Sequence, residues 1–206
     1  MKYVNELTER YGALASIKAD IESAVNKVIE SYKKGGKVLL CGNGGSASDS
    51  DHVAGELLKG FLMKREPIGD ELSALTAELG EDAVKLQRGI PAIPLPQLSG
   101  VLSAFANDVD PSLVFAQLVY ALGTENDVLF AFSTSGNSQN IVKAVKAVRA
   151  KGVAVVSFTG ESGGKLLPIS DICLRAPERE TFKIQEYHLP IYHAICAEVE
   201  YELFGK

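Results

Sequence analysis

The sequence predicts an α/β fold, a three-layer αβα sandwich in which helices flank a five-stranded parallel sheet. Three observations support this prediction. Five short apolar runs are nearly continuous in hydrophobicity, which is typical of strands that are covered on both faces. Segments with the apolar spacing of helices separate these runs, which indicates a parallel sheet whose strands alternate with helices. The length of 206 residues, 46% of them hydrophobic, fits a single domain over residues 1–206 with a sizeable core.

The first expected element is a long helix over residues 3–34, where apolar side chains such as Leu14 and Ile21 recur at helical spacing. Gly35 and Gly36 end it, because glycine tolerates the left-handed conformation that follows many helices. The expected strands are Lys37–Gly42, Ile90–Leu95, Val128–Ser133, Val153–Thr159 and Ile172–Arg175. Helices are expected over residues 46–62, 139–151 and 181–204.

Charge and composition argue against several classes of protein. The net charge of −5 and the lack of a Lys/Arg block argue against a nucleic-acid partner. No apolar run approaches the roughly 20 residues that span a bilayer, so no membrane partner is expected. The first ten residues lack the apolar core of a signal peptide, which predicts a cytoplasmic protein. The cysteines Cys41, Cys173 and Cys196 have no paired spacing, so we expect reduced thiols.

A glycine-rich loop, CGNGGSAS at residues 41–48, directly follows the first expected strand. In open parallel sheets, ligands bind where the carboxyl ends of the strands lead into helices. Glycines let the backbone approach a ligand closely, and the N-terminus of the following helix offers free N–H groups to an anion. The loop lacks the lysine of a P-loop and the spacing of a dinucleotide fingerprint. By itself it also fits an ordinary glycine turn that caps a helix.

A second polar loop, STSGNS at residues 133–138, follows the third expected strand and precedes the helix at 139–151. Its four hydroxyl groups are neutral donors that suit phosphate oxygens, while backbone N–H groups and the helix dipole supply the positive potential. A Ser/Thr turn that caps the helix is the alternative. Capping needs one hydroxyl, however, so two such loops on one sheet edge favour a phosphate site.

Candidate acid–base or metal-binding side chains occur on two of the expected helices. His52 and Glu56 are spaced i, i+4, which puts them on one helix face beyond the first loop. That spacing suits a metal site or an acid–base pair, and it also suits an ordinary surface ion pair. On the last helix, His188 and His193 are separated by about 140° around the axis and should not serve one site together. We therefore expect His188 to be a packed or surface histidine.

Several motifs together resemble the sugar isomerase (SIS) domain, and more closely the phosphoheptose (sedoheptulose 7-phosphate) isomerases. The matching segments are CGNGGSASDSDHVAGEL at 41–57, AND at 106–108, STSGNS at 133–138, FTGESGGKL at 158–166 and IQEYHLPIYH at 184–193. They are spread over most of the chain. A serine-rich loop alone would indicate only the broader domain.

The resemblance implies an isomerase that interconverts sedoheptulose 7-phosphate and D-glycero-D-manno-heptose 7-phosphate through an enediol-type intermediate. It implies a zinc ion bound by His52, Glu56, Gln185 and His193, with Glu56 as the base and His193 as the acid. It also implies a homo-oligomer, with a tetramer as the family's pattern. The residues at positions that match substrate contacts are Asn43, Gly44, Gly45, Ser46, Glu56, Asn107, Asp108, Ser133, Thr134, Ser135, Ser138 and Gln185.

The spacing of two implied zinc ligands raises a geometric difficulty. Eight residues of straight helix separate Gln185 and His193 by about 12 Å, too far for both to reach one ion. Either the helix is broken, for which Pro190 is a candidate, or the two side chains come from different subunits. We favour different subunits, which would make the active site shared. For Asn107 and Asp108, an ordinary turn before Pro111 is the alternative to a substrate contact.

Residues 64–89 look like an insertion relative to compact members of the family. Asp70 to Leu79 has helical propensity, and we expect this segment to form an interface or to decorate the surface, in preference to a lid. Two other functions remain open: a non-catalytic SIS protein that senses a phosphosugar or scaffolds a partner, and an isomerase of another ketose phosphate. The presence together of His52, Glu56, Gln185 and His193 favours the enzyme.

Overall fold

A computed structural model describes residues 1–205 and contains a five-stranded, entirely parallel sheet. The strand order is β2-β1-β3-β4-β5, and every neighbouring pair is parallel. The strands are β1 (Val38–Cys41), β2 (Ala92–Pro94), β3 (Val128–Phe132), β4 (Ala154–Thr159) and β5 (Ile172–Arg175). All five lie within the predicted apolar runs, so the predicted α/β fold class is confirmed.

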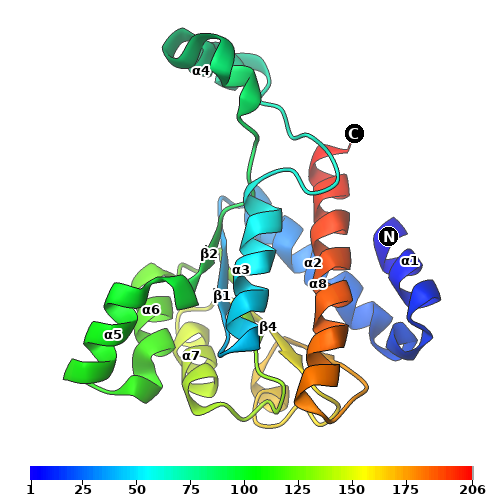
Figure 1. Ribbon diagram of the computed structural model, residues 1–206, viewed down its shortest axis with the longest axis vertical. Coiled ribbons are helices and arrows are strands. Elements are labelled where there is room, and N and C mark those ends of the chain that lie inside the picture. The colour runs from blue at the N-terminus through cyan, green and yellow to red at the C-terminus, as the bar shows by residue number, and fades with distance from the viewer. Residues whose placement is uncertain (206) are drawn as a thin grey trace.

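Helices cover both faces of the sheet (Figure 1). The α-helices are α1 (Lys2–Arg10), α2 (Lys18–Lys33), α3 (Gly45–Leu58), α4 (Gly69–Leu79), α5 (Ser99–Asp108), α6 (Val114–Leu122), α7 (Gln139–Arg149) and α8 (Thr181–Phe204). Side chains alternate along β1: Val38 and Leu40 join the core with α2, α3 and α8, whereas Leu39 and Cys41 join the core with α6 and α7. Burial on both faces explains why the strands are continuously apolar.

The predicted single helix over 3–34 is wrong in its middle. The α1 helix ends at Arg10, a 3₁₀ segment spans Gly12–Ile17, and α2 begins at Lys18. Tyr11, between them, has φ −121° and ψ 74°, which is not helical. Apolar residues are buried on both sides of the break, so hydrophobic periodicity alone runs through it without interruption.

Residues 59–89 form an arm that leaves the sheet, and α4 lies at its far end, away from the body of the molecule (Figure 1). The predicted helix at 70–79 is confirmed as α4, which has no buried residue. At the base of the arm, Arg65 is fully buried and pairs with Glu200 of α8 at 2.7 Å. The base is therefore anchored in the core while the tip is not. Within residues 1–205, none of the helices is long and apolar enough to cross a membrane.

Candidate functional site

The first polar loop joins β1 to α3 at the carboxyl edge of the sheet. Gly44 has φ 55°, a conformation that glycine adopts at little cost, and the turn closes where the Ser46 N–H donates to the Asn43 carbonyl at 3.0 Å. The Asn43 side chain exchanges two hydrogen bonds with Asn140 at the start of α7, at 2.9 and 3.0 Å. This amide pair joins the first loop to the second, and sequence reasoning missed Asn140.

The second polar loop follows β3, the neighbour of β1 in the sheet. The Ser133 hydroxyl donates to the Ser138 hydroxyl at 3.0 Å, and the Asn137 N–H donates to the Ser135 hydroxyl at 3.1 Å. These bonds curl the loop, with Gly136 at φ 65°, ahead of the N-terminus of α7. The hydroxyl groups therefore shape a turn ahead of the N-terminus of α7, and the dipole at that helix end favours an anion.

A cavity of about 480 Å³ opens beside the second loop. Its lining combines residues of the second loop, residues between β4 and α8, and one residue of α8, namely Thr134, Ser135, Asn137, Gly160, Glu161, Ser162, Glu178, Arg179 and Ile184. The Gly160 N–H donates to the Thr134 carbonyl at 2.8 Å, which holds the two walls together. Arg179 brings a positive charge to the rim, where it pairs with Glu161 at 2.7 Å. This cavity can take a small polar or anionic ligand.

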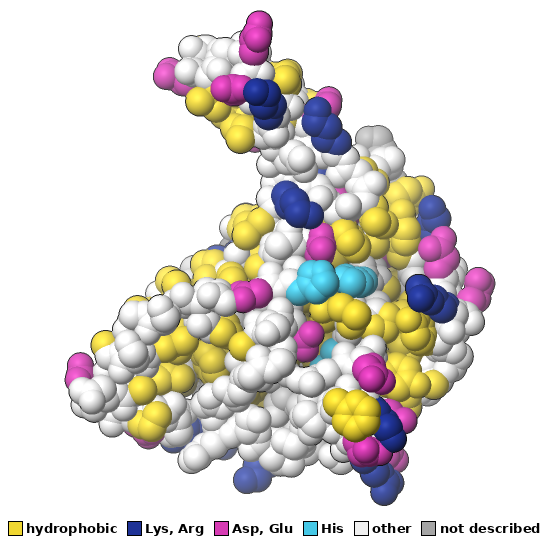
Figure 2. Space-filling model, in the orientation of Figure 1, with side chains coloured by type: hydrophobic (Ala, Val, Ile, Leu, Met, Phe, Trp, Pro, Cys, Tyr) yellow, Lys and Arg dark blue, Asp and Glu magenta, His cyan; other side chains and the backbone are white. Residues whose placement is uncertain are grey.

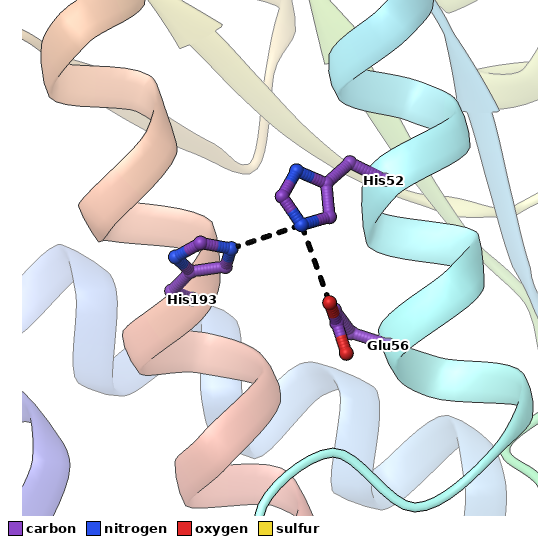
Figure 3. Close-up of side chains that lie close together, drawn as sticks. All are labelled: His52, Glu56 and His193. Carbon is purple, nitrogen blue, oxygen red and sulfur yellow. Dashed lines mark hydrogen bonds and ion pairs between the residues drawn. The ribbon is translucent and has the colours of Figure 1, made fainter.

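Three side chains from two helices converge to form a cluster that we call the triad: His52 and Glu56 of α3, and His193 of α8 (Figure 3). The Nε2 atom of His52 lies 3.2 Å from Nε2 of His193 and 3.2 Å from Oε1 of Glu56. Figure 2 shows the histidine side chains at the centre of the concave side of the molecule. Three predicted site residues are thus brought together within one chain.

The packing of α3 against α8 produces this convergence. On α3, Val53 and Leu57 are fully buried, so the adjacent positions 52 and 56 lie at the border of the buried face. On α8, Ile191 and Tyr192 are buried immediately before His193. His52, Glu56 and His193 therefore lie at the edge of the buried face of their helices, where they are only partly covered and stay accessible to a ligand.

The triad has the chemistry and spacing of a divalent metal site. Burial, and next the charge of His52, lower the pKa of His193, while Glu56 acts in the opposite direction. A neutral imidazole is the form that ligates a metal. A tetrahedral zinc ion with bonds of about 2.0–2.1 Å would hold its ligand atoms about 3.3 Å apart. Two of the separations here are 3.2 Å, and all three ligand atoms lie within 4.8 Å of one another. The residues present therefore fit the metal that the resemblance implies.

Behind the triad lies a polar contact that sequence reasoning missed. The Tyr192 hydroxyl lies 3.1 Å from Nδ1 of His52 and 3.4 Å from Oδ1 of Asp49. Burial raises the pKa of Asp49 to about 6. These contacts join residues about 140 positions apart in the chain, so no local sequence pattern could have identified them.

Gln185, the fourth implied ligand, does not lie with the triad in its own chain. The α8 helix is continuous from Thr181 to Phe204 with Pro190 inside it, so the alternative of a broken helix is wrong. The side chain of Gln185 instead lies against Gly45 of the first loop, where a Cβ atom would come within 2.6 Å of its Nε2. A side chain at position 45 would therefore require the flexible Gln185 amide to shift.

The remaining candidates occupy two different environments. His188 is fully buried, its Nε2 lies 3.2 Å from the Thr159 carbonyl, and burial lowers its pKa to about 4, so of the two predicted alternatives, packed or surface, the packed one is found. Asn107 and Asp108 are exposed at the end of α5, where their side chains hydrogen-bond to each other at 2.9 Å. The structure does not bring these two residues to the triad, and a role in substrate binding stays a prediction.

Comparison with known proteins places these features in a family. The SIS domain family model matches residues 2–160. The chain is 38% identical to a phosphoheptose isomerase of Burkholderia pseudomallei over 98% of this chain and 94% of that protein.

Two solved structures agree. A phosphoheptose isomerase from Neisseria gonorrhoeae superposes with a TM-score of 0.75 at 30% identity, covering 95% of this chain and 94% of that one. A phosphoheptose isomerase from Francisella tularensis also reaches a TM-score of 0.75, at 29% identity over 97% of this chain and 95% of that one. The fold and nearly the whole length are thus similar to those of these enzymes.

Proposed function

The chain belongs to the SIS domain family and, within it, to the phosphoheptose isomerases, and from this membership we propose that it interconverts sedoheptulose 7-phosphate and D-glycero-D-manno-heptose 7-phosphate. The observation that carries this proposal is the triad of His52, Glu56 and His193 on the same molecule as two phosphate-type loops. A sensor of sugar phosphates would need the loops but not the triad.

Glu56 is the proposed base, because isomerisation of a ketose requires removal of a proton from the carbon next to the carbonyl. Its two oxygens have different neighbours: Oε1 faces His52 at 3.2 Å, and Oε2 faces Lys59 at 3.2 Å. One oxygen can therefore stay in the triad while the other takes the proton and returns it to the neighbouring carbon. This division resolves the conflict between ligand and base roles for a single carboxylate.

His193 is the proposed acid, which passes a proton between the two oxygens that exchange carbonyl and hydroxyl character. Its Nε2 faces His52 in the triad, so Nδ1 is the nitrogen free for this transfer. We propose that zinc is held by His52, Glu56 and His193. When bound, such an ion stabilises negative charge that develops on the substrate oxygens.

The phosphate group is proposed to bind at the second loop. Ser133, Thr134, Ser135 and Ser138 surround a turn at the N-terminus of α7, where their hydroxyl groups and the helix dipole favour an anion. The proposed sugar contacts in the first loop are Asn43, Gly44, Gly45 and Ser46. The two hydrogen bonds between Asn43 and Asn140 fix the first loop relative to the second.

We infer that the active site is shared between subunits of a homo-oligomer, a tetramer by the family's pattern. The geometry supports this, because α8 is unbroken and Gln185 lies beside Gly45, so a glutamine that completed the triad would come from another copy. Mixing Gln185→Ala with His193→Ala subunits should restore part of the lost activity, since a fraction of sites would regain a full set. Mixed oligomers that assemble but regain no activity would contradict sharing.

The direct test of function is incubation of the zinc-loaded protein with sedoheptulose 7-phosphate, followed by NMR detection of the aldose phosphate. We expect conversion in both directions. Binding of the sugar phosphate without conversion would instead support the sensor alternative. Conversion of a different ketose phosphate at a higher kcat/KM would reassign the substrate while keeping the reaction class.

A further inference from the structure

His188 is a buried polar residue that the proposed reaction does not use. Its ring is fully buried and lies edge-on to the rings of Phe132 and Phe158, at centroid distances of 6.0 and 5.8 Å. Its Nδ1 atom is buried without a hydrogen-bond partner. A phenylalanine would fill the same space without leaving a nitrogen unpaired. The use of a histidine here therefore lies with its other nitrogen, Nε2.

The His188 Nε2 atom is a hydrogen-bond donor. It lies 3.2 Å from the carbonyl oxygen of Thr159, the last residue of β4, and a carbonyl oxygen can only accept. Burial lowers the pKa of His188 to about 4, so at neutral pH the ring carries one proton. Because Nδ1 has no partner, that proton lies on Nε2. His188 thus donates to the end of β4.

The peptide group between Thr159 and Gly160 connects this contact to the second loop. No peptide bond within residues 1–205 is cis, and in a planar trans peptide the C=O and N–H groups point in opposite directions. The Thr159 carbonyl faces His188, and the Gly160 N–H of the same peptide donates to the Thr134 carbonyl at 2.8 Å. A Cβ atom at Gly160 would lie only 2.9 Å from the Glu178 carbonyl oxygen. This peptide group is therefore held on both sides and closely packed.

The peptide group between Thr134 and Ser135 continues the same chain of hydrogen bonds. Its carbonyl faces Gly160, so its N–H, which belongs to Ser135, points the opposite way. Within residues 1–205, no group accepts a hydrogen bond from this N–H, and Ser135 is exposed. Successive hydrogen bonds polarise one another, so each donor strengthens the next. The chain that begins at His188 therefore ends in an oriented, open N–H group in the second loop.

We propose that His188 is a positioning residue that, through these two peptide groups, aims and strengthens the Ser135 N–H as a donor to the phosphate group of the substrate. The proposal rests on the proposed function for its ligand, a phosphate at the second loop. The hydroxyl groups of that loop are neutral donors that can rotate, whereas the Ser135 N–H has a fixed direction. His188 itself does not touch the phosphate.

The first experiment removes the donor and keeps an aromatic ring. In His188→Phe the Thr159 carbonyl still accepts from the Ala176 N–H, at 2.9 Å, so no buried carbonyl loses its only partner and the variant should fold. Inorganic phosphate is titrated into the protein and the Ser135 amide signal is followed by ¹H–¹⁵N NMR. We expect phosphate affinity to fall by about 5- to 20-fold, because an N–H bond to a charged group is weakened.

Two further variants distinguish positioning from a merely structural role. His188→Gln keeps an N–H donor of similar reach and should retain phosphate affinity within about 3-fold, although an amide in an apolar core lowers stability. Val199→Ala is the matched control, because Val199 is fully buried on the same helix in the same core. Its cavity should lower the denaturation midpoint and leave phosphate affinity unchanged. Phosphate affinity is thus expected to follow the donor and not the stability.

The contrary outcomes are distinct. Wild-type phosphate affinity in His188→Phe, or an equal loss in His188→Gln, would contradict the positioning role. Should His188→Phe fail to fold, ¹⁵N NMR of the wild type decides, since a bare Nε2 on His188 would overturn the proposal and a protonated one supports it. A wild-type Ser135 amide that saturating phosphate does not shift would refute both the phosphate site and this proposal. Phosphate binding does not need turnover, so a lack of isomerisation alone would refute only the proposed reaction.

Discussion

Two parts of α8, residues 181–193 and residues 194–204, use polar side chains in opposite ways. In the first part, Gln185 and His193 are partly exposed and keep donor or acceptor positions open. In the second part, Glu198 and Glu200 are fully buried, and their oxygens accept backbone N–H groups at the start of α1 and at residues 61–63. The comparison teaches that a buried polar group with every bond satisfied holds the fold, whereas one with open positions serves chemistry.

Glu200 shows how far this structural role extends. Its carboxylate pairs with Arg65 at 2.7 Å, and Arg65 also donates to the carbonyl oxygens of Leu57 and Glu56 at 2.6 and 3.0 Å. Both carbonyls belong to the last turn of α3, where carbonyl oxygens have no acceptor role within the helix. Residues 194–204 of α8 thus hold the end of α3 that carries Glu56, while residues 181–193 supply His193.

The largest predicted effect concerns the buried ion pair of Arg65 and Glu200, which tests the structural role of residues 194–204. Arg65→Met leaves Glu200 buried without its cation, which should lower the free energy of unfolding by about 3–5 kcal/mol. Denaturant unfolding followed by circular dichroism measures this. Arg88→Met is the matched control, because Arg88 is partly exposed and donates to the Glu66 carbonyl, so its loss should cost about 1 kcal/mol or less. Equal losses of unfolding free energy in Arg65→Met and Arg88→Met would contradict the structural role of the Arg65–Glu200 pair.

A smaller predicted effect sharpens the comparison with a third region, the tip of the arm. Because α4 has no buried residue and Leu79 is exposed, Leu79→Ser should change the free energy of unfolding by no more than about 0.5 kcal/mol. The same denaturant experiment, repeated over a range of protein concentrations, measures it. A concentration-dependent loss of several kcal/mol would show that another copy covers α4 and that the arm is an interface.

Much of the fold could be predicted from the sequence, because strands buried on both faces, such as β1, β3 and β4, are continuous runs of mostly apolar residues. The break at Tyr11 did not, because apolar periodicity is the same on either side of it. Helical angles predicted that His188 does not share a site with His193, but they left open whether it is packed or on the surface, which the burial of its helix face decides.

The site was predictable only in part, for a similar reason. The i, i+4 spacing of His52 and Glu56 is local, and the family motifs indicated His193. The contacts of Asp49 and Tyr192, and the pair of Arg65 with Glu200, join residues more than 130 positions apart. They depend on how α3 and α8 pack, which no pattern along the chain records.

The central claim is that Glu56 takes the proton from the substrate carbon while the polar loops hold the phosphate. Glu56→Gln tests it most directly, because the amide keeps the shape of the side chain but cannot accept that proton. Turnover of sedoheptulose 7-phosphate should fall by at least about 10²- to 10⁴-fold, while the affinity for the sugar phosphate, measured by calorimetry, changes little. Turnover within a few-fold of the wild type would contradict the claim.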